Sequence, residues 1–178
     1  MRISPVIFYL QRNAQADILK TVSTISSLTH AHQRCIMCCY IYVVLGLQLL
    51  NNPGQDKTEL FKKIMTSLAA NVKEKFAPDE TELLARLYDI ENFINLSRDE
   101  IKSSGYVIDT LEASLWCFLT TDNFKDCILK AVNLGDDADT VAAIAGAFAG
   151  LYYGLDAIPK EWVDNLLGKE NIYKLCGM

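Results

Sequence analysis

The chain lacks the excess of positive charge that nucleic-acid-binding proteins carry. Its 178 residues include 17 Lys and Arg against 22 Asp and Glu, which gives a formal net charge of −5. No cluster of basic residues offsets this balance, and binding to a polyanion depends on such a cluster. Nucleic acid is therefore not expected as a partner.

Long apolar runs are missing as well. The most apolar stretch, Cys35 to Leu50, has 16 residues and includes Gln48, whereas a membrane-spanning helix needs roughly 20. This stretch predicts a central buried helix, and no membrane is expected as a partner. No signal-peptide pattern is found either, so a cytoplasmic location is expected.

Histidine is scarce, and the cysteines form no pattern typical of a zinc site. The sequence has two histidines and six cysteines, the latter at positions 35, 38, 39, 117, 127 and 176. Most of the cysteines lie in apolar helical patterns, which indicates reduced core thiols. Cys35 and Cys38 have the spacing of a metal or redox pair, but no second pair and no suitably spaced histidine accompany them, so this motif is weak.

Alternation of polar and apolar residues, the pattern of β-strands, is not found over any useful length. Neither an internal repeat nor a linker divides the chain. Helical periodicity is found almost throughout, and 178 residues suffice for one domain with a sizeable core. The sequence therefore predicts a single all-α domain over residues 1–178.

Capping residues and apolar spacing predict where the helices lie. The expected helices cover residues 17–27, 29–50, 56–76, 79–94, 97–102, 110–119, 121–133 and 140–153, with a last helix from Pro159. The helices at 35–50 and 140–153 are both expected to be buried. Leu83, Leu87, Ile90 and Ile94 should face inward on the 79–94 helix, and Trp162, Leu166 and Leu167 should dock the last helix.

The most unusual stretch runs from Asn133 to Gly154. Its second half is a helix in which small residues recur every four positions and form one bare stripe: Ala142, Gly146, Gly150 and Gly154. Glycine inside a helix costs about 0.8–1.0 kcal/mol relative to alanine, so the stripe indicates that another helix packs closely against it.

This stretch opens with three carboxylates and a hydroxyl, on Asp136, Asp137, Asp139 and Thr140. One aspartate can cap the helix that follows, and negative charge is favoured at a helix N-terminus. Three crowded carboxylates are instead relieved by a bound cation, and oxygen ligands suit Mg²⁺, Mn²⁺ or Ca²⁺. The spacing alone leaves open both a metal site and a capped, solvated helix start.

The segment NLGDDADTVAAIAGAFAGLYYGLDAIPKEW resembles the C-terminal signature of the ADP-ribosylglycohydrolases. That signature is Gly-x-Asp-x-Asp-Thr, an Ala/Gly-rich helix, an aromatic-Gly turn and Ile-Pro-x-x-Trp. The segments MRISP at the start, SSLTHAHQR at Ser26–Arg34 and GYVIDTLEASLWCF at Gly105–Phe118 are also similar to the family. The resemblance covers essentially the whole chain and implies a compact orthogonal helical bundle whose N-terminal part is missing.

The resemblance also implies a reaction. Family members release ADP-ribose from a modified protein side chain or a related acceptor, with a pair of Mg²⁺ or Mn²⁺ ions that orients the ribose hydroxyls and a water. Asp137 and Asp139 are implied as catalytic residues and, together with Thr140, as metal ligands. Asp136 is not expected to bind the ion directly.

Four residues are implied as substrate contacts. Thr29 and His30 match the Thr-His motif at the family's ADP-ribose pocket, Tyr106 matches a pocket wall, and Arg2 lies in the matching MRISP segment. Structural roles stay open beside these: a histidine before a core helix is often a hydrogen-bond donor within the fold, and an aromatic residue often fills a helix junction.

The front of the chain departs from the family. Full members contribute a Thr-Asp-Asp motif and an upstream glutamate from their N-terminal half, and Asp17 is the only acid in the first 50 residues here. We therefore expect a half-built site with at most one weakly bound ion, and weak or absent hydrolase activity for this chain alone. An exposed apolar patch, with self-association or a missing N-terminal half as partner, is also expected. The alternative is a non-catalytic relative that binds ADP-ribose or serves structurally, as crystallin relatives do.

Overall fold

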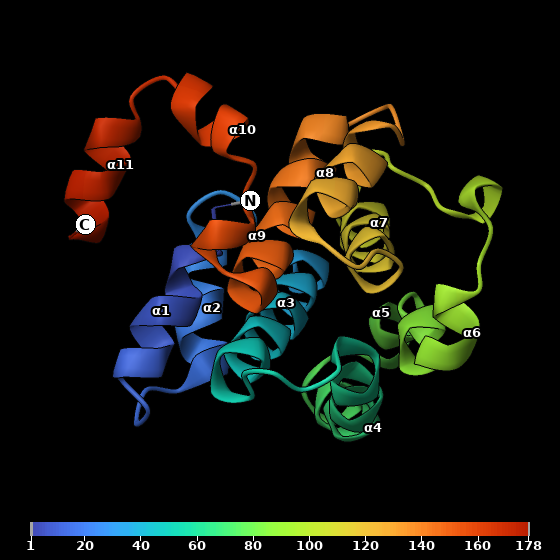
Figure 1. The fold of residues 1–178 in the computed structure, drawn as a ribbon. Helices are drawn as coiled ribbons and strands as arrows, with labels where there is room; N and C mark the ends of the chain where they lie inside the picture. Colours follow the sequence, from blue (N-terminus) through green and yellow to red (C-terminus); the bar gives the residue numbers. More distant parts are fainter. Residues whose placement is uncertain (1, 178) are drawn as a thin grey trace.

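Helices make up the regular structure of the chain, which a computed structural model describes from residue 2 to residue 177. Met1, the first residue of MRISP, and Met178 lie outside the described residues. Residues 2–177 contain no β-strand, so the all-α prediction is confirmed. The α-helices (Figure 1) are α1 (Pro5–Arg12), α2 (Ile18–Ser27), α3 (Gln33–Asn51), α4 (Lys57–Lys75), α5 (Pro78–Glu82), α6 (Ile90–Ile94), α7 (Val107–Leu119), α8 (Phe124–Val132), α9 (Ala138–Tyr153), α10 (Lys160–Asn165) and α11 (Lys169–Cys176).

The core forms around α3, which packs against α1, α2, α4, α7 and α9. Met37, Ile41 and Leu45 recur every four residues on α3 and are completely buried, so they form one continuous apolar face. Aromatic rings from three further helices meet nearby. The centroid of Phe118 (α7) lies 5.8 Å from that of Phe61 (α4) and 5.7 Å from that of Phe148 (α9).

Length and composition alone would allow α3 to cross a membrane, since its most apolar window has a mean hydropathy of 1.5. However, 56% of that window is buried inside the protein. A core helix has the same composition, and the burial favours that interpretation.

The helix expected from Thr29 begins four residues later, at Gln33. The main chain first makes a turn, in which His30 N–H donates to the carbonyl of Ser26 at 2.8 Å and the Ser26 hydroxyl donates to the carbonyl of His30 at 2.9 Å. His32 then caps α3 by accepting a hydrogen bond from Arg34 N–H. Thr29 and His30 therefore lie in a loop.

The prediction of one helix over 79–94 is wrong, because this region is divided into α5, a 3-10 turn at Ala85–Tyr88 and α6. Asp89 explains one break. Its carboxylate accepts from Asn92 N–H at 3.1 Å and so caps α6, with a non-helical backbone at φ −119° and ψ 81°. Leu83 is consequently 42% exposed rather than inward-facing, while Leu87 and Ile90 are buried as expected.

Two other helix starts also differ from expectation. Asn123 caps α8 by accepting from Asp126 N–H at 2.8 Å. The Thr121 hydroxyl, expected near this cap, instead donates to the carbonyl of Cys117. The helix expected from Thr110 already begins at Val107. The first shift reflects competition between nearby polar side chains for the same unpaired backbone groups, whereas α7 begins at Val107 without a side-chain cap.

The C-terminal residues form two short helices, α10 and α11, instead of one. Trp162 does dock, since its ring lies 6.4 Å from that of Phe124. Leu166 and Leu167 do not, because they are 50% and 95% exposed. Figure 1 shows α10 and α11 leading away from α8 and α9 along one side of the molecule.

The small-residue stripe of α9 explains only one close helix contact. A Cβ atom added at Gly146 would lie 2.8 Å from Cδ1 of Ile128 on α8, so glycine lets these two helices approach. At Gly150 the same atom would meet nothing within 4 Å. The prediction that α9 is buried holds for one face only, which carries Val141, Ala145, Phe148 and Ala149.

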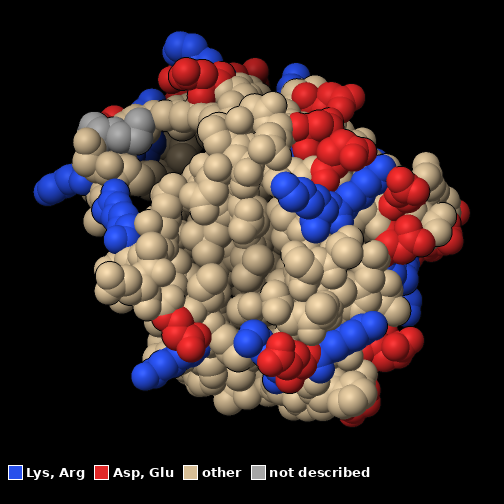
Figure 2. Space-filling view, turned by 90° about the horizontal axis from the view of Figure 1, so that it is seen from below, with Lys and Arg blue, Asp and Glu red and all other residues tan. Residues whose placement is uncertain are grey.

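Figure 2 shows a broad area without charged side chains at the centre of one face, with Lys, Arg, Asp and Glu gathered around it. Two long segments contain no charged residue, 3–11 and 35–55. On α1, Phe8 and Tyr9 are about half exposed, at 49% and 54%. Self-association through such a surface stays a prediction.

Candidate functional site

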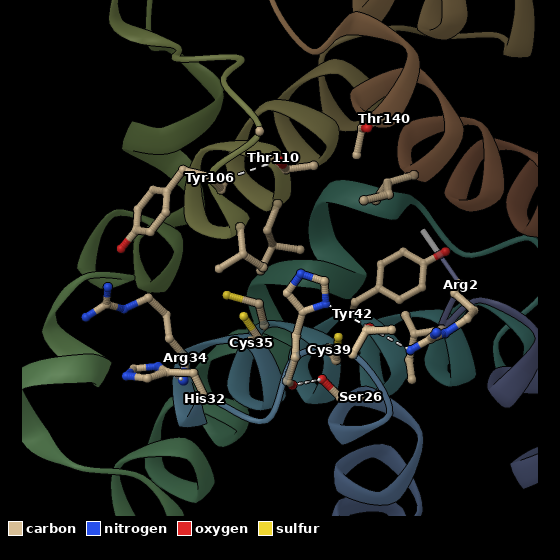
Figure 3. Close-up of a pocket in the computed structure, with 18 of the residues that line it drawn as sticks. Arg2, Ser26, His32, Arg34, Cys35, Cys39, Tyr42, Tyr106, Thr110 and Thr140 are labelled. Carbon is tan, nitrogen blue, oxygen red and sulfur yellow. Dashed lines mark hydrogen bonds between the residues drawn. The ribbon is translucent and has the colours of Figure 1, made fainter.

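A cavity of about 720 Å³ lies between the start of α3, the loop before α7 and the start of α9 (Figure 3). Every residue that the sequence predicted for the site lines it except Asp139: Arg2, Thr29, His30, Tyr106, Asp137 and Thr140. Segments more than 100 residues apart in the chain therefore contribute to one space. Their roles stay predictions, but the fold places them together.

One wall is a chain of hydrogen bonds. Arg2 Nη2 donates to the Thr29 hydroxyl at 2.9 Å and to the carbonyl of Ile25 at 3.1 Å. The same Thr29 oxygen lies 2.8 Å from Nδ1 of His30. Thr29 thus joins a permanent cation to an imidazole. This pairing is a hydrogen bond within the fold, and His30 also lines the cavity, so its role as a substrate contact stays a prediction.

The opposite wall is the acidic loop. Asp137 is the residue before α9, yet its carboxylate makes no capping bond. Instead Oδ1 accepts from the Thr140 hydroxyl at 3.0 Å, while Asp137 N–H donates to the carbonyl of Ser103 at 3.1 Å. The carboxylate comes so close to Gly105 that a Cβ there would lie 3.1 Å from Oδ2. Glycine at 105 therefore gives the carboxylate room.

The other two acids of this loop point elsewhere. Asp136 has a left-handed backbone, with φ 50°, and its Oδ2 lies 3.4 Å from the Ser103 hydroxyl. Asp139 is exposed and does not line the cavity. In residues 2–177 no three His, Cys, Asp or Glu side chains come together as a metal-binding group.

The third wall contains residues that sequence reasoning missed. Arg34 lines the cavity and makes an ion pair with Glu80 of α5, and its guanidinium lies 5.7 Å from the ring centroid of Tyr106. Tyr106 is 42% exposed, so it does not fill a helix junction. Arg34 belongs to the segment SSLTHAHQR and could have been noted there, but nothing in the sequence around Glu80 signals a partner 46 residues away.

The sequence as a whole decides the family. A model of the ADP-ribosylglycohydrolase family matches residues 1–178. The chain belongs to the ADP-ribosylglycohydrolases. It is 37% identical over 176 residues to an ADP-ribosylarginine hydrolase, Tri1, from Pseudomonas putida, which covers 99% of this chain and 43% of that protein.

Two other ADP-ribosylglycohydrolase relatives match over shorter stretches. The ADP-ribosyl-[dinitrogen reductase] glycohydrolase of Rhodospirillum rubrum is 46% identical over 65 residues, which is 36% of this chain and 22% of that protein. The human ADP-ribosylhydrolase ARH3 is 28% identical over 102 residues, or 49% of this chain and 28% of that protein. The chain thus spans less than half the length of each of these relatives.

The metal ions that the ADP-ribosylglycohydrolase family implies can be tested against these side chains. Two hard oxygen donors converge, on Asp137 and Thr140, 3.0 Å apart. Mg²⁺ takes six oxygen ligands and readily keeps several waters. The donors fit one hydrated ion, and Asp139 does not lie with them in the cavity.

The floor of the cavity carries thiols from α3, namely Cys35, Cys38 and Cys39. Burial raises the pKa of all three, chiefly because a thiolate is poorly solvated there. Neutral thiols are weak nucleophiles and weak metal ligands. Cys35 and Cys38 therefore contribute neutral thiols to the floor of the cavity.

Proposed function

We propose that the cavity binds ADP-ribose and that the chain serves in a hydrolase that releases ADP-ribose from a modified protein. One observation carries the proposal: the cavity brings the Arg2–Thr29–His30 wall to face Asp137 and Thr140. The family resemblance implies substrate and metal roles for these same residues. A positive and imidazole-bearing wall opposite a carboxylate suits a ligand with a diphosphate at one end and ribose hydroxyls at the other.

For the acceptor, we propose arginine. Two relatives named ADP-ribosylarginine hydrolase, from Pseudomonas putida and Serratia proteamaculans, are 37% and 36% identical and each cover 99% of the chain. The matched region covers almost the whole chain, and the segments that line the cavity are spread along it. The reaction proposed is hydrolysis of the bond between the ribose and the guanidinium nitrogen.

Asp137 and Thr140 are proposed to hold a Mg²⁺ or Mn²⁺ ion, which when bound would polarise an oxygen ligand and orient it. Thr29 and His30 would hold the ligand in place, and Arg2 would neutralise a phosphate. Because the described residues bring together only two oxygen donors, one ion would be bound weakly, and a metal pair would need donors from elsewhere. Turnover by this chain alone is accordingly expected to be low, since each ~1.4 kcal/mol of lost positioning lowers the rate tenfold.

The test is release of ADP-ribose from an ADP-ribosylarginine peptide, with Mn²⁺ or Mg²⁺ and with chelator, beside calorimetric titration of ADP-ribose. Binding with metal-dependent release, however slow, supports the hydrolase. Asp137→Asn should abolish the release and Asp136→Asn should be milder, since Asp136 faces Ser103. ADP-ribose binding without any release fits both a half-built hydrolase site and the non-catalytic alternative, and the absence of binding would contradict the proposal.

A further inference from the structure

Arg34, in the third wall of the cavity, forms an ion pair with Glu80, which lies outside the cavity. Glu80 on α5 is only 4% exposed, and its two oxygens accept hydrogen bonds from Nε and Nη2 of Arg34 at 2.5 and 2.9 Å. Two parallel bonds of this kind fix the plane of a guanidinium as well as its position. Arg34 lines the cavity and Glu80 does not. The pair therefore links α5 to the cavity wall.

Arg34 in turn restrains Tyr106. The guanidinium carbon lies 5.7 Å from the ring centroid, within the range of a cation–π contact. Figure 3 shows the guanidinium beside the hydroxyl end of the ring, with His32 close by. The pKa of Arg34 is raised, chiefly by its hydrogen bonds to Glu80 and in smaller part by Tyr106. The backbone of Tyr106 is held by hydrogen bonds to Ser104 and Thr110, and its ring is 42% exposed, so the contact with Arg34 is one restraint on the direction of the ring.

The loop that carries Tyr106 is fixed at its other end to the acidic wall. Ser103 accepts from Asp137 N–H at 3.1 Å, and Ser104 donates to Asp109 at 2.6 Å. Residues 103–106 thus run from Asp137 to Arg34, with both ends held. The spacing between the carboxylate of Asp137 and the ring of Tyr106 depends on both attachments.

We propose that Glu80 is a positioning residue for the ADP-ribose site: through Arg34 it holds Tyr106 in place as a wall for the ligand. This inference rests on the proposed function. A ligand that meets an ordered side chain avoids the entropy cost of ordering it on binding. Without the carboxylate, Arg34, whose side chain is 31% exposed, turns to solvent and releases the ring.

The test is a double-mutant cycle on ADP-ribose affinity, measured by calorimetry. Glu80→Gln keeps the shape of the side chain and removes its charge, and it should raise Kd about fivefold, the cost of ordering one side chain. In a Tyr106→Ala background the same substitution should have no further effect. The matched control is Glu82→Gln, an identical change at an exposed position on the same helix, which should leave Kd unchanged. An equal effect of Glu80→Gln with and without Tyr106 would overturn the proposal.

A second measurement does not depend on ligand. Amide hydrogen exchange of residues 103–109 in the free protein should be faster in Glu80→Gln than in wild type and unchanged in Glu82→Gln. Arg34→Lys keeps the positive charge but cannot make two parallel hydrogen bonds to Glu80, so its exchange rates should be intermediate. If wild type fails to bind ADP-ribose, the proposed function fails, while the exchange rates still decide whether Glu80 holds this loop. Faster exchange throughout the protein would instead indicate general destabilisation and count against a positioning role.

Discussion

The hydroxyl of Thr29 connects two other side chains of the cavity wall. It contacts the guanidinium of Arg2 and the imidazole of His30, at 2.9 and 2.8 Å. Arginine can only donate, so the Thr29 oxygen must accept from Arg2. When the Thr29 hydroxyl donates its hydrogen bond to Nδ1 of His30, the ring proton is on Nε2, and Nε2–H can donate a hydrogen bond to a ligand.

His30→Ala should weaken ADP-ribose binding, because the imidazole is the group that Thr29 orients at the cavity. Loss of one hydrogen bond to a ligand phosphate predicts about a tenfold higher Kd. Calorimetric titration gives the result, with circular dichroism as a check on the fold. Equal affinity of wild type and variant would reject a role for His30.

Thr29→Val should have a smaller effect of the same kind, about fivefold in Kd, because the ring and the guanidinium remain but lose their shared partner. Thr24→Val is the matched control. The Thr24 hydroxyl donates only to the carbonyl of Lys20 on α2, and Thr24 does not line this cavity. If both substitutions change Kd alike, the hydrogen-bond chain has no special part in binding.

At the scale of elements, some glycines inside helices allow a neighbouring helix to approach closely, and others do not. Gly46 on α3 faces α1 and α9, where an added Cβ would overlap Ile7 and lie 3.4 Å from Cδ1 of Leu151. Gly150 on α9 faces open space. Both lie inside helices, so the same substitution should have opposite effects on stability.

Gly150→Ala should raise the free energy of unfolding by up to about 1 kcal/mol, which is the helix propensity difference between the two residues. Gly46→Ala should lower it by about 1–3 kcal/mol, because the extra methyl group pushes α1 away from α3. Urea denaturation followed by circular dichroism measures both. A destabilised Gly150→Ala variant would show that this face of α9 is covered in solution.

For the whole molecule, the buried thiols predict how stability depends on pH. Burial raises the pKa of Cys117 to about 12 and that of Cys127 to about 11, from an ordinary value of 9.0. Above pH 9 the unfolded chain loses these protons first. The stability contributed by the two groups is therefore complete below pH 9 and is lost as the pH rises towards 11 and 12, by up to about 1.4 kcal/mol per pH unit for each thiol.

The free energy of unfolding, measured in urea at pH 8 to 10.5, should accordingly fall above pH 9. Cys117→Ala should lower stability at every pH but make this decline less steep. Cys176→Ser, at an exposed cysteine, should leave the slope unchanged. The assignment to the buried thiols fails if Cys117→Ala and Cys176→Ser have the same effect on the slope.

Exposed leucines near the C-terminal end predict self-association of the molecule. Leu167 and Leu175 are 95% and 87% exposed, and contact between such side chains of two molecules would remove apolar surface from water. Light scattering should show a concentration-dependent increase in mass. Leu175→Glu should reduce it, whereas Asn171→Glu, which adds the same charge to an exposed position of α11, should not. A monomer at every concentration would contradict this prediction.

The sequence by itself determined those features whose cause lies within a few residues. Capping predicted the start of α4, where Asp56 accepts from Glu59 N–H, and the capping box of Ser97 and Glu100. The family motif likewise singled out both sides of the cavity, Thr29-His30 and the loop at Asp137. Such signals are local because a cap satisfies backbone groups in its own first turn, and a motif is a contiguous run of residues.

Only the tertiary structure decided which of these residues meet. Asp137 and Asp139 are equivalent in the motif, yet the turn into α9 directs Asp137 to the cavity and leaves Asp139 at the surface. Glu80 and Arg34 form their ion pair across 46 residues because the fold brings α5 to the start of α3. Long-range pairs of this kind depend on how helices pack against one another. The periodicity of one helix shows which of its faces is buried but does not identify the helix that packs there.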